Sequence, residues 1–130
     1  FYTVGGNVFL NNMISLAGGS NVFSSYSGYP ELSPSQLIVA KPQVIIADEM
    51  YNASFTLQAI KSFPDGSKVP AIEDGRYYVL GNLATSLLNE PGPLAVYGVE
   101  LIHLILTGQA PHIINSSWVM EYIKPELPVF

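Results

Sequence analysis

Few residues of this chain have types and spacing that could support chemistry. Asp48 and Glu49 directly follow residues 44–47, an apolar run typical of a buried strand. Catalytic carboxylates and metal ligands often occur at the end of a parallel strand, but a carboxylate in a solvated loop also commonly caps the next helix. We favour the solvated loop, because nothing else in the sequence pairs with these two residues.

The two histidines do not have the spacing of a metal site. His103 and His112 lie nine positions apart, whereas a helical zinc site uses histidines at i and i+4. His103 follows Glu100 by three positions on a predicted helix, so the two share one face. We interpret them as a hydrogen-bonded polar pair at the edge of the core. A catalytic role of His103 with Asp48 and Glu49 is the alternative.

Other common catalytic motifs are missing from the sequence. It contains no cysteine, no G-x-S-x-G nucleophile motif and no glycine-rich phosphate loop. Tyrosine is abundant, with eight copies, and Tyr51 lies in the loop after the apolar run. Its ring could stack on a ligand in a cleft, or it could pack with its hydroxyl in water. Both interpretations stay open.

Composition restricts the possible partners. The 130 residues include 5 basic and 10 acidic side chains, for a formal net charge of −5. This balance argues against nucleic acid, which requires clustered Lys and Arg, and against a polybasic membrane-surface site. The most apolar stretch, residues 94–106, is interrupted by Gly98, Glu100 and His103. It is also shorter than the roughly 20 residues that span a bilayer.

Predicted strands and helices alternate along the chain. Strands are expected at residues 1–4 (continuing from upstream), 21–23, 43–47 and 76–80. Helices are expected at residues 7–17 with Asn7 as N-cap, 34–41, 53–62 and 94–106, with shorter helical turns at 71–75 and 119–123. Residues 81–90 are expected to form a long loop, with a single helical turn within it as the alternative. The alternation predicts one α/β domain over residues 1–130: a Rossmann-like three-layer sandwich whose mostly parallel sheet has helices on both faces. Ligands of such sheets meet the loops at the strand carboxyl ends, here residues 5–6, 48–52 and 81–89.

Four sequence segments resemble a known family in order and spacing. They are residues 16–23 (LAGGSNVF), residues 33–46 (SPSQL, then KPQVII), residues 74–80 (DGRYYVL), and residues 91–111 (PGP, then ELI and GQAP). They are similar to segments of periplasmic binding proteins of the iron-siderophore, haem and cobalamin class. The similarity extends from residue 1 to about residue 111 and concerns the C-terminal lobe of that family. The resemblance implies that the N-terminal lobe and the helix that connects the two lobes lie outside residues 1–130.

The resemblance implies a substrate-binding component of an ABC importer and not an enzyme. It implies an extracytoplasmic location, periplasmic or anchored at the cell surface, and partners in the permease transmembrane subunits and the N-terminal lobe. The small-molecule ligand would be an iron(III) chelate, haem or cobalamin held between the lobes, with no intrinsic cofactor or metal. The matched loop positions imply the following cleft residues: Tyr51, Glu49, Asn82, Leu83 and Asn89.

The sequence departs from the family pattern at two places. A Glu that contacts permease arginines in the family is replaced here by Ser35, and Glu31 could substitute for it if its loop points outward. Asn89 and Glu90 stand where the family often has a basic residue, so a strongly anionic ligand is less suited to this lobe alone. Two other hypotheses stay open: an α/β enzyme or metal-cluster domain using Asp48 and Glu49, and a ligand-free interaction domain.

Overall fold

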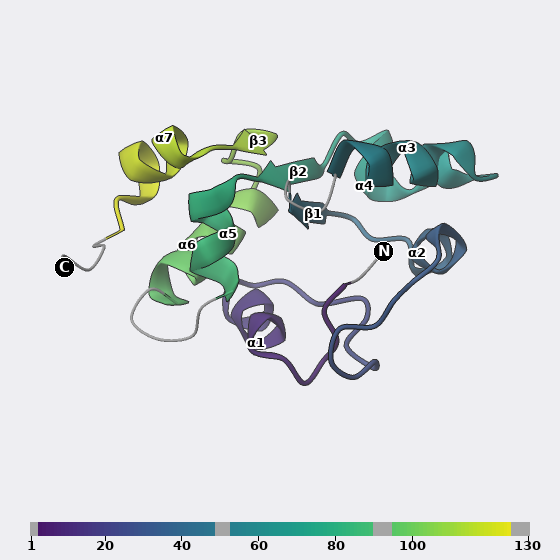
Figure 1. Ribbon diagram of the computed structural model, residues 1–130, viewed down its shortest axis with the longest axis horizontal. Coiled ribbons are helices and arrows are strands. Elements are labelled where there is room, and N and C mark those ends of the chain that lie inside the picture. Colours follow the sequence, from purple (N-terminus) through teal and green to yellow (C-terminus); the bar gives the residue numbers. More distant parts are fainter. Residues whose placement is uncertain (1–2, 49–52, 90–94, 126–130) are drawn as a thin grey trace.

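A small parallel sheet lies at the centre of the molecule. The computed structural model describes residues 3–48, 53–89 and 95–125 (Figure 1). Its strands are β1 (Ile45–Asp48), β2 (Tyr77–Leu80) and β3 (Ile113–Ile114), in the order β1-β2-β3. Both pairings are parallel, with Ile45 opposite Tyr77 and Leu80 opposite Ile114.

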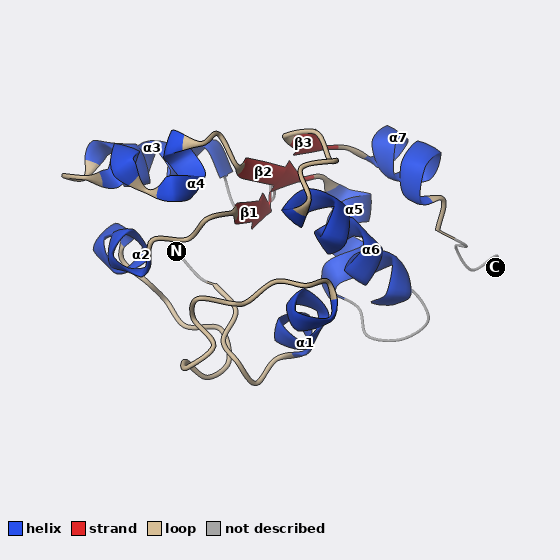
Figure 2. Ribbon diagram, turned by 180° about the vertical axis from the view of Figure 1, so that it is seen from behind, coloured by secondary structure: helices blue, strands red, loops and turns tan. Residues whose placement is uncertain are grey.

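Helices precede and follow these strands (Figure 2). They are α1 (Phe9–Leu16), α2 (Pro34–Ala40), α3 (Ala53–Ser62), α4 (Pro70–Glu73), α5 (Asn82–Asn89), α6 (Ala95–Leu106) and α7 (Ser116–Trp118). A 3-10 turn, η2 (Gly66–Lys68), precedes α4, and a π-helical segment, η3 (Val119–Ile123), follows α7. No helix in the described part of the chain is long and apolar enough to cross a membrane.

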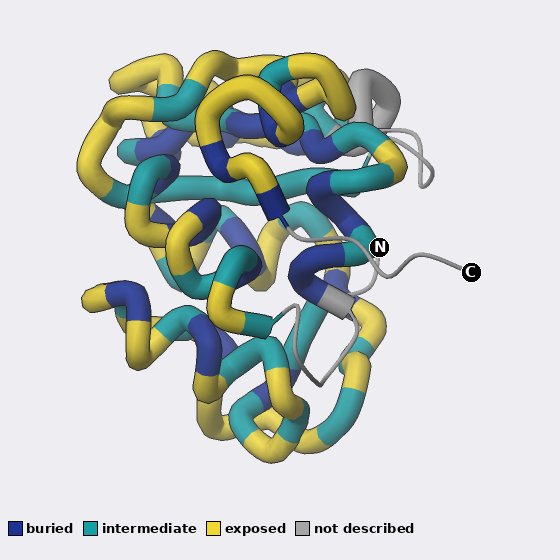
Figure 3. The backbone as a smooth tube through the Cα atoms, turned by 90° about the vertical axis from the view of Figure 1, so that its left-hand side faces the viewer, coloured by how far each residue is buried: buried dark blue, intermediate teal, exposed yellow. Residues whose placement is uncertain are grey.

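Two apolar clusters cover the two faces of the sheet. The larger cluster joins α1, α5 and α6 to β2, and the smaller one joins α2, α3 and α4. Neighbouring residues of β1 belong to different clusters, since Ile46 packs against the larger and Ile45 against the smaller. Side chains alternate between the faces of a strand, so the clusters lie on opposite sides. Figure 3 accordingly shows buried segments above and below the extended segments at its middle. The predicted α/β sandwich is confirmed.

Of three helix ends predicted from the local sequence, two are confirmed. Gly18 adopts φ +97° just after α1, as expected for a glycine stop. Ser33 precedes α2, and its N–H donates to Gln36 Oε1 at 2.7 Å, as predicted for a capping box. The prediction of Asn7 as an N-cap was wrong, because Val8 holds that position. The Asn7 side chain instead accepts a hydrogen bond from Gly28 N–H at 2.6 Å, which ties two loops together.

Two strand predictions differ from the structure. Thr3 and Val4 are not in a strand, although residues 1–2 lie outside the described residues, and residues 21–23 lead into a turn. Asn21 explains the turn: its Oδ1 accepts from Phe23 N–H at 3.0 Å, and its Nδ2 donates to Val4 O at 2.8 Å. A strand also needs a neighbouring strand to pair with, and these segments have none among the residues described.

The region after β2 was predicted as a loop but forms helix α5. Its polar residues suggested a loop, whereas Ala84, Leu87 and Leu88 are buried against the larger cluster and stabilise a helix by tertiary packing. The helix packs closely on its neighbours. A Cβ added at Gly98 of α6 would overlap Met13 Cε of α1 and Leu87 O of α5. Glycine is therefore required where the three helices meet.

Arg76, the only arginine of the chain, links the sheet to α6. Its guanidinium Nη2 donates to Ile105 O at 2.9 Å and to Leu106 O at 2.8 Å. These carbonyls belong to the last turn of the helix, where backbone acceptors lack partners within the helix. A cation is also favourable at the negative end of the helix dipole. Arg76, the residue that precedes β2, therefore holds the C-terminus of α6 near the start of that strand.

Candidate ligand-binding site

The carboxyl ends of the three strands meet at one edge of the sheet. The parallel register places Asp48, the last residue of β1, opposite Leu80, and Leu80 opposite Ile114. Gly81 and Asn115, the residues that follow β2 and β3, therefore emerge side by side. Gly81 N–H donates to Ile114 O at 2.9 Å, and a Cβ on Gly81 would come within 3.2 Å of that oxygen. This close approach favours glycine at position 81.

Two helices begin at this edge. Asn82 is the first residue of α5 and is exposed, and Leu83 beside it is partly buried. Asn115 is exposed and caps α7, since its Oδ1 accepts from Trp118 N–H at 2.8 Å. The described part of the edge, from Asp48 to Asn82 and Asn115, carries one carboxylate, two amides and no basic side chain. It is suited to hydrogen bonding and apolar contact rather than to binding a highly charged anion.

The structure tests the placement of only some predicted cleft residues. Asn82 and Leu83 do lie at the strand-end edge. Asn89 is the last residue of the same helix, roughly 10 Å along its axis from Asn82. Glu49 and Tyr51 lie outside the described residues, so their place in a cleft stays a prediction. Asn115 was not predicted for the site, because β3 has only two residues and leaves no strand pattern to recognise.

The residues proposed for the enzymatic alternative do not share a pocket in the described structure. His103 is exposed on α6, and its Nδ1 lies 3.3 Å from Ala17 O at the end of α1. It therefore joins two helices at the edge of the core. Asp48 lines a cavity whose described lining does not include His103. Within residues 3–48, 53–89 and 95–125, no group of three His, Asp or Glu side chains could hold a metal ion.

The two residues considered for permease docking lie on the surface. Ser35 is exposed in the first turn of α2, and its Oγ is 2.9 Å from Ser33 Oγ. Glu31 is exposed two positions before Ser33, so its loop points it outward. That orientation meets the condition under which Glu31 could act in place of the missing glutamate. Docking itself stays a prediction.

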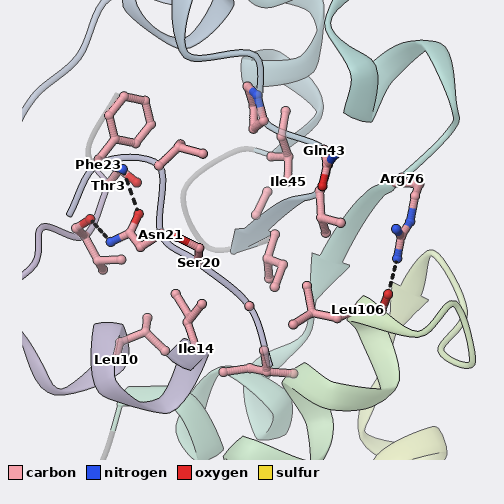
Figure 4. Close-up of a pocket in the computed structure, with 18 of the residues that line it drawn as sticks. Thr3, Leu10, Ile14, Ser20, Asn21, Phe23, Gln43, Ile45, Arg76 and Leu106 are labelled. Atoms are coloured by element: carbon pink, nitrogen blue, oxygen red, sulfur yellow. Dashed lines mark hydrogen bonds between the residues drawn. The ribbon is translucent and has the colours of Figure 1, made fainter. Parts of the chain in front are cut away.

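A cavity of about 1450 Å³ runs beside β1, and Leu80 of β2 also contributes to its lining (Figure 4). Its lining includes Leu10 and Ile14 from α1 and Val44 and Ile46 from the β1 region. The Tyr77 side chain also reaches it, and burial raises the pKa of this phenol from 10 to about 12, because the phenolate would lose its hydration. The cavity wall is mainly apolar, in contrast to the polar strand-end edge.

Solved structures share this fold. A possible iron-binding (periplasmic solute-binding) protein from Staphylococcus epidermidis superposes with a TM-score of 0.67 at 23% identity, over 81% of this chain and 40% of that one. An ABC-type Fe3+-hydroxamate transport system from Saccharomonospora viridis gives a TM-score of 0.65 at 20% identity, over 81% and 36% of the two chains. This chain thus spans about two fifths of the length of these proteins. No family model and no curated protein matches the sequence.

The comparisons define the fold class to which the chain belongs. Its α/β sandwich is the fold found in part of iron-binding periplasmic solute-binding proteins and Fe3+-hydroxamate transport components. The family resemblance noted in the sequence thus agrees with the folds that the structure resembles. At these identities, the likeness establishes the architecture, and the function has to be argued from the site.

Proposed function

We propose that this chain is the C-terminal lobe of an extracytoplasmic solute-binding protein that serves an ABC importer. The observation that carries the proposal is the parallel sheet, whose carboxyl edge gathers Asp48, Asn82 and Asn115, within a fold shared with two solute-binding proteins. Ligands of open α/β sheets bind at that edge. The chain acts as a binding module and not as an enzyme.

The ligand is proposed to be an iron(III) chelate, haem or cobalamin, held between this lobe and an N-terminal lobe. The proposed contacts from this chain are Tyr51, Glu49, Asn82, Leu83 and Asn89. Amide side chains fix polar groups of the ligand, and Leu83 and Tyr51 add apolar contact area. Since the described part of the edge has no basic side chain, a neutral or weakly charged complex suits this lobe better than a strongly anionic one.

The loaded protein is proposed to dock on the transmembrane subunits of a permease. Glu31 and Ser35, both exposed near the start of α2, form the proposed contact on this lobe. A carboxylate at Glu31 would complement arginine side chains on the permease. Charge reversal at Glu31 is therefore expected to reduce transport without reducing ligand affinity.

Calorimetry tests the split cleft directly. Ferric hydroxamate, haem and cobalamin are titrated into residues 1–130 and into the longer protein with both lobes. We expect one of them to bind the longer protein tightly, and the isolated lobe to bind weakly or not at all, because it supplies half of the contacts. Tight binding by residues 1–130 alone would refute the split cleft. If neither form binds any of the three, the proposed ligand class is wrong.

A pair of variants locates the site. Asn82→Ala in the longer protein is expected to weaken ligand binding roughly tenfold, the effect of losing about 1.4 kcal/mol of hydrogen bonding. Gln58→Ala on α3 is the matched control, since Gln58 is an exposed amide side chain on another helix. Equal affinity of the two variants would show that the ligand does not contact the start of α5.

A further inference from the structure

The turn between β3 and α7 carries an acceptor motif for an N-linked sugar. Asn115, Ser116 and Ser117 fit the pattern N-x-S/T, in which the middle residue is not proline. The motif occurs once more, at residues 52–54, but its asparagine lies outside the described residues. Such triplets often arise by chance, so the motif has meaning only where the fold presents the asparagine amide to solvent.

The fold holds this motif at the surface between two buried anchors. Asn115, Ser116 and Ser117 are all exposed, whereas Ile114 before them and Val119 after them are fully buried. Val119 N–H donates to Asn115 O at 3.1 Å, which closes the turn between the two anchors. The three motif residues are therefore accessible, while the backbone that carries them is fixed.

The two polar atoms of the Asn115 side chain have different environments. Oδ1 accepts a hydrogen bond from Trp118 N–H at 2.8 Å and thereby caps α7. Nδ2, the atom to which a sugar is joined, makes no hydrogen bond among the described residues. N-glycosylation replaces one hydrogen of Nδ2 and leaves the carbonyl oxygen as an acceptor. The helix cap and a glycan can therefore exist on the same side chain.

The strand face on which Asn115 lies is open in the described chain. Burial alternates along residues 113–115, with Ile114 buried and its two neighbours exposed. Asn115 is extended, with φ −86° and ψ 170°, so its side chain shares a face with Ile113, which is 65% exposed. β3 is also the outer strand of the described sheet, so Asn115 lies at the border of the carboxyl edge, on the side away from β1. A sugar on this side chain has room beside the strand.

We propose that Asn115 carries an N-linked glycan, joined through Nδ2. The donor is a lipid-linked sugar phosphate, and a separate transferase catalyses the step. Nδ2 forms a bond to the anomeric carbon of the sugar, and the bond from that carbon to the phosphate oxygen breaks. The phosphate leaves with the electron pair, and a base of the transferase takes the amide proton. The inference rests on the extracytoplasmic location proposed above, because the motif is an acceptor in exported chains.

Mass spectrometry of the natural protein, purified from its own source organism, tests the modification. Trypsin cleaves after Arg76, so the two motifs fall on separate peptides. We expect the peptide that contains Asn115 to carry a sugar mass, and fragmentation to place this mass on Asn115. Asn82 is the internal control and should be unmodified, because it is an exposed amide at the same sheet edge without a hydroxyl two positions later. An unmodified Asn115 would overturn the proposal.

Two variants produced in the same organism separate the acceptor motif from the helix cap. Ser117→Ala keeps Asn115 and its cap but removes the hydroxyl that the motif requires, whereas Ser117→Thr retains a hydroxyl. We expect the sugar to be lost in Ser117→Ala and kept in Ser117→Thr. A sugar that persists in Ser117→Ala, or that is lost in both variants, would contradict attachment through the motif.

The cell fraction that contains the protein separates this inference from the proposed function. An exported protein that binds its ligand but has an unmodified Asn115 would overturn the glycan alone. A protein that stays inside the cell with an unmodified Asn115 would overturn both the glycan and the extracytoplasmic role.

Discussion

Replacing Arg76 with methionine should destabilise the protein by removing the cation that binds the end of α6. Methionine keeps most of the apolar stem and no donor, so the change isolates the guanidinium. The lost interactions are the bonds from Nη2 to Ile105 O and Leu106 O, at 2.9 and 2.8 Å. The arginine is partly buried, which limits screening by water.

The two hydrogen bonds of Arg76 do not contribute equally to the free energy of unfolding. Gly108 N–H also donates to Ile105 O at 3.1 Å, so that carbonyl keeps a partner in the variant. Leu106 O has Arg76 as its only donor among the described residues. Hydrogen bonds to charged groups contribute about 1.5–3 kcal/mol each. Allowing for the retained partner and for partial exposure, we expect Arg76→Met to lower the free energy of unfolding by about 2–3 kcal/mol.

Urea denaturation followed by circular dichroism measures this effect. Lys68→Met is the matched control, because Lys68 pairs with Asp65 at 3.4 Å while the two side chains are 77% and 71% exposed. Such a surface pair contributes less than about 1 kcal/mol, so this variant should be near wild type. Arg76→Lys should lower the free energy of unfolding less than Arg76→Met does, but should remain below wild type, since lysine lacks the planar guanidinium donors of arginine. A loss in Arg76→Met no larger than in Lys68→Met would refute the capping role of Arg76.

Three further predictions concern packing, titration and a helix end. In the same urea assay, Gly98→Ala should lower the free energy of unfolding by about 1–3 kcal/mol, because the new Cβ overlaps Met13 and Leu87. The control Val96→Ala, at a residue 65% exposed, should change the free energy of unfolding by less than about 0.5 kcal/mol. Similar values for the two would contradict the close helix contact. Tyr77 has a native pKa of about 12 against 10 unfolded, so the native state holds its proton longer and stability should fall as pH rises from 10 to 12. In an absorbance titration, the Tyr77→Phe variant should lack the tyrosine ionisation seen near pH 12 in the wild type. If that ionisation is unchanged in the variant, it belongs to another tyrosine. Gly108→Ala should lower the free energy of unfolding by about 1 kcal/mol, because Gly108 has φ +75°, although an added Cβ would meet nothing within 4 Å. An unchanged thermal unfolding temperature would show that the loop relaxes to accept alanine.

Local patterns predicted the elements whose signals are contained in a few neighbouring residues. The apolar run before Asp48 became β1, and the Ser33–Gln36 capping box and the glycine after α1 marked real helix ends. The segment Arg76–Leu80 gave β2 for the same reason. These signals depend on propensity, capping and side-chain periodicity, which act over one or two turns.

Predictions that depended on distant partners were less successful. α5 was taken for a loop because its helical character comes from Ala84 and Leu87 packing on α6 and α1. Asn7 was expected to cap a helix but bonds Gly28, 21 positions away. Residues 21–23 look like a strand in isolation, but no neighbouring strand among the described residues pairs with them. The side chains that complete these interactions are far away in the sequence and cannot be read locally.

The sequence by itself determined the alternation of strands and helices, the fold class and the edge of the sheet where a ligand is expected. It could do so because burial on both faces imposes an apolar run on each strand, and because parallel strands end on one side. Only the tertiary structure decided which polar residues meet at that edge, bringing Asn115 beside Gly81 and Asn82 through β3, a strand of two residues.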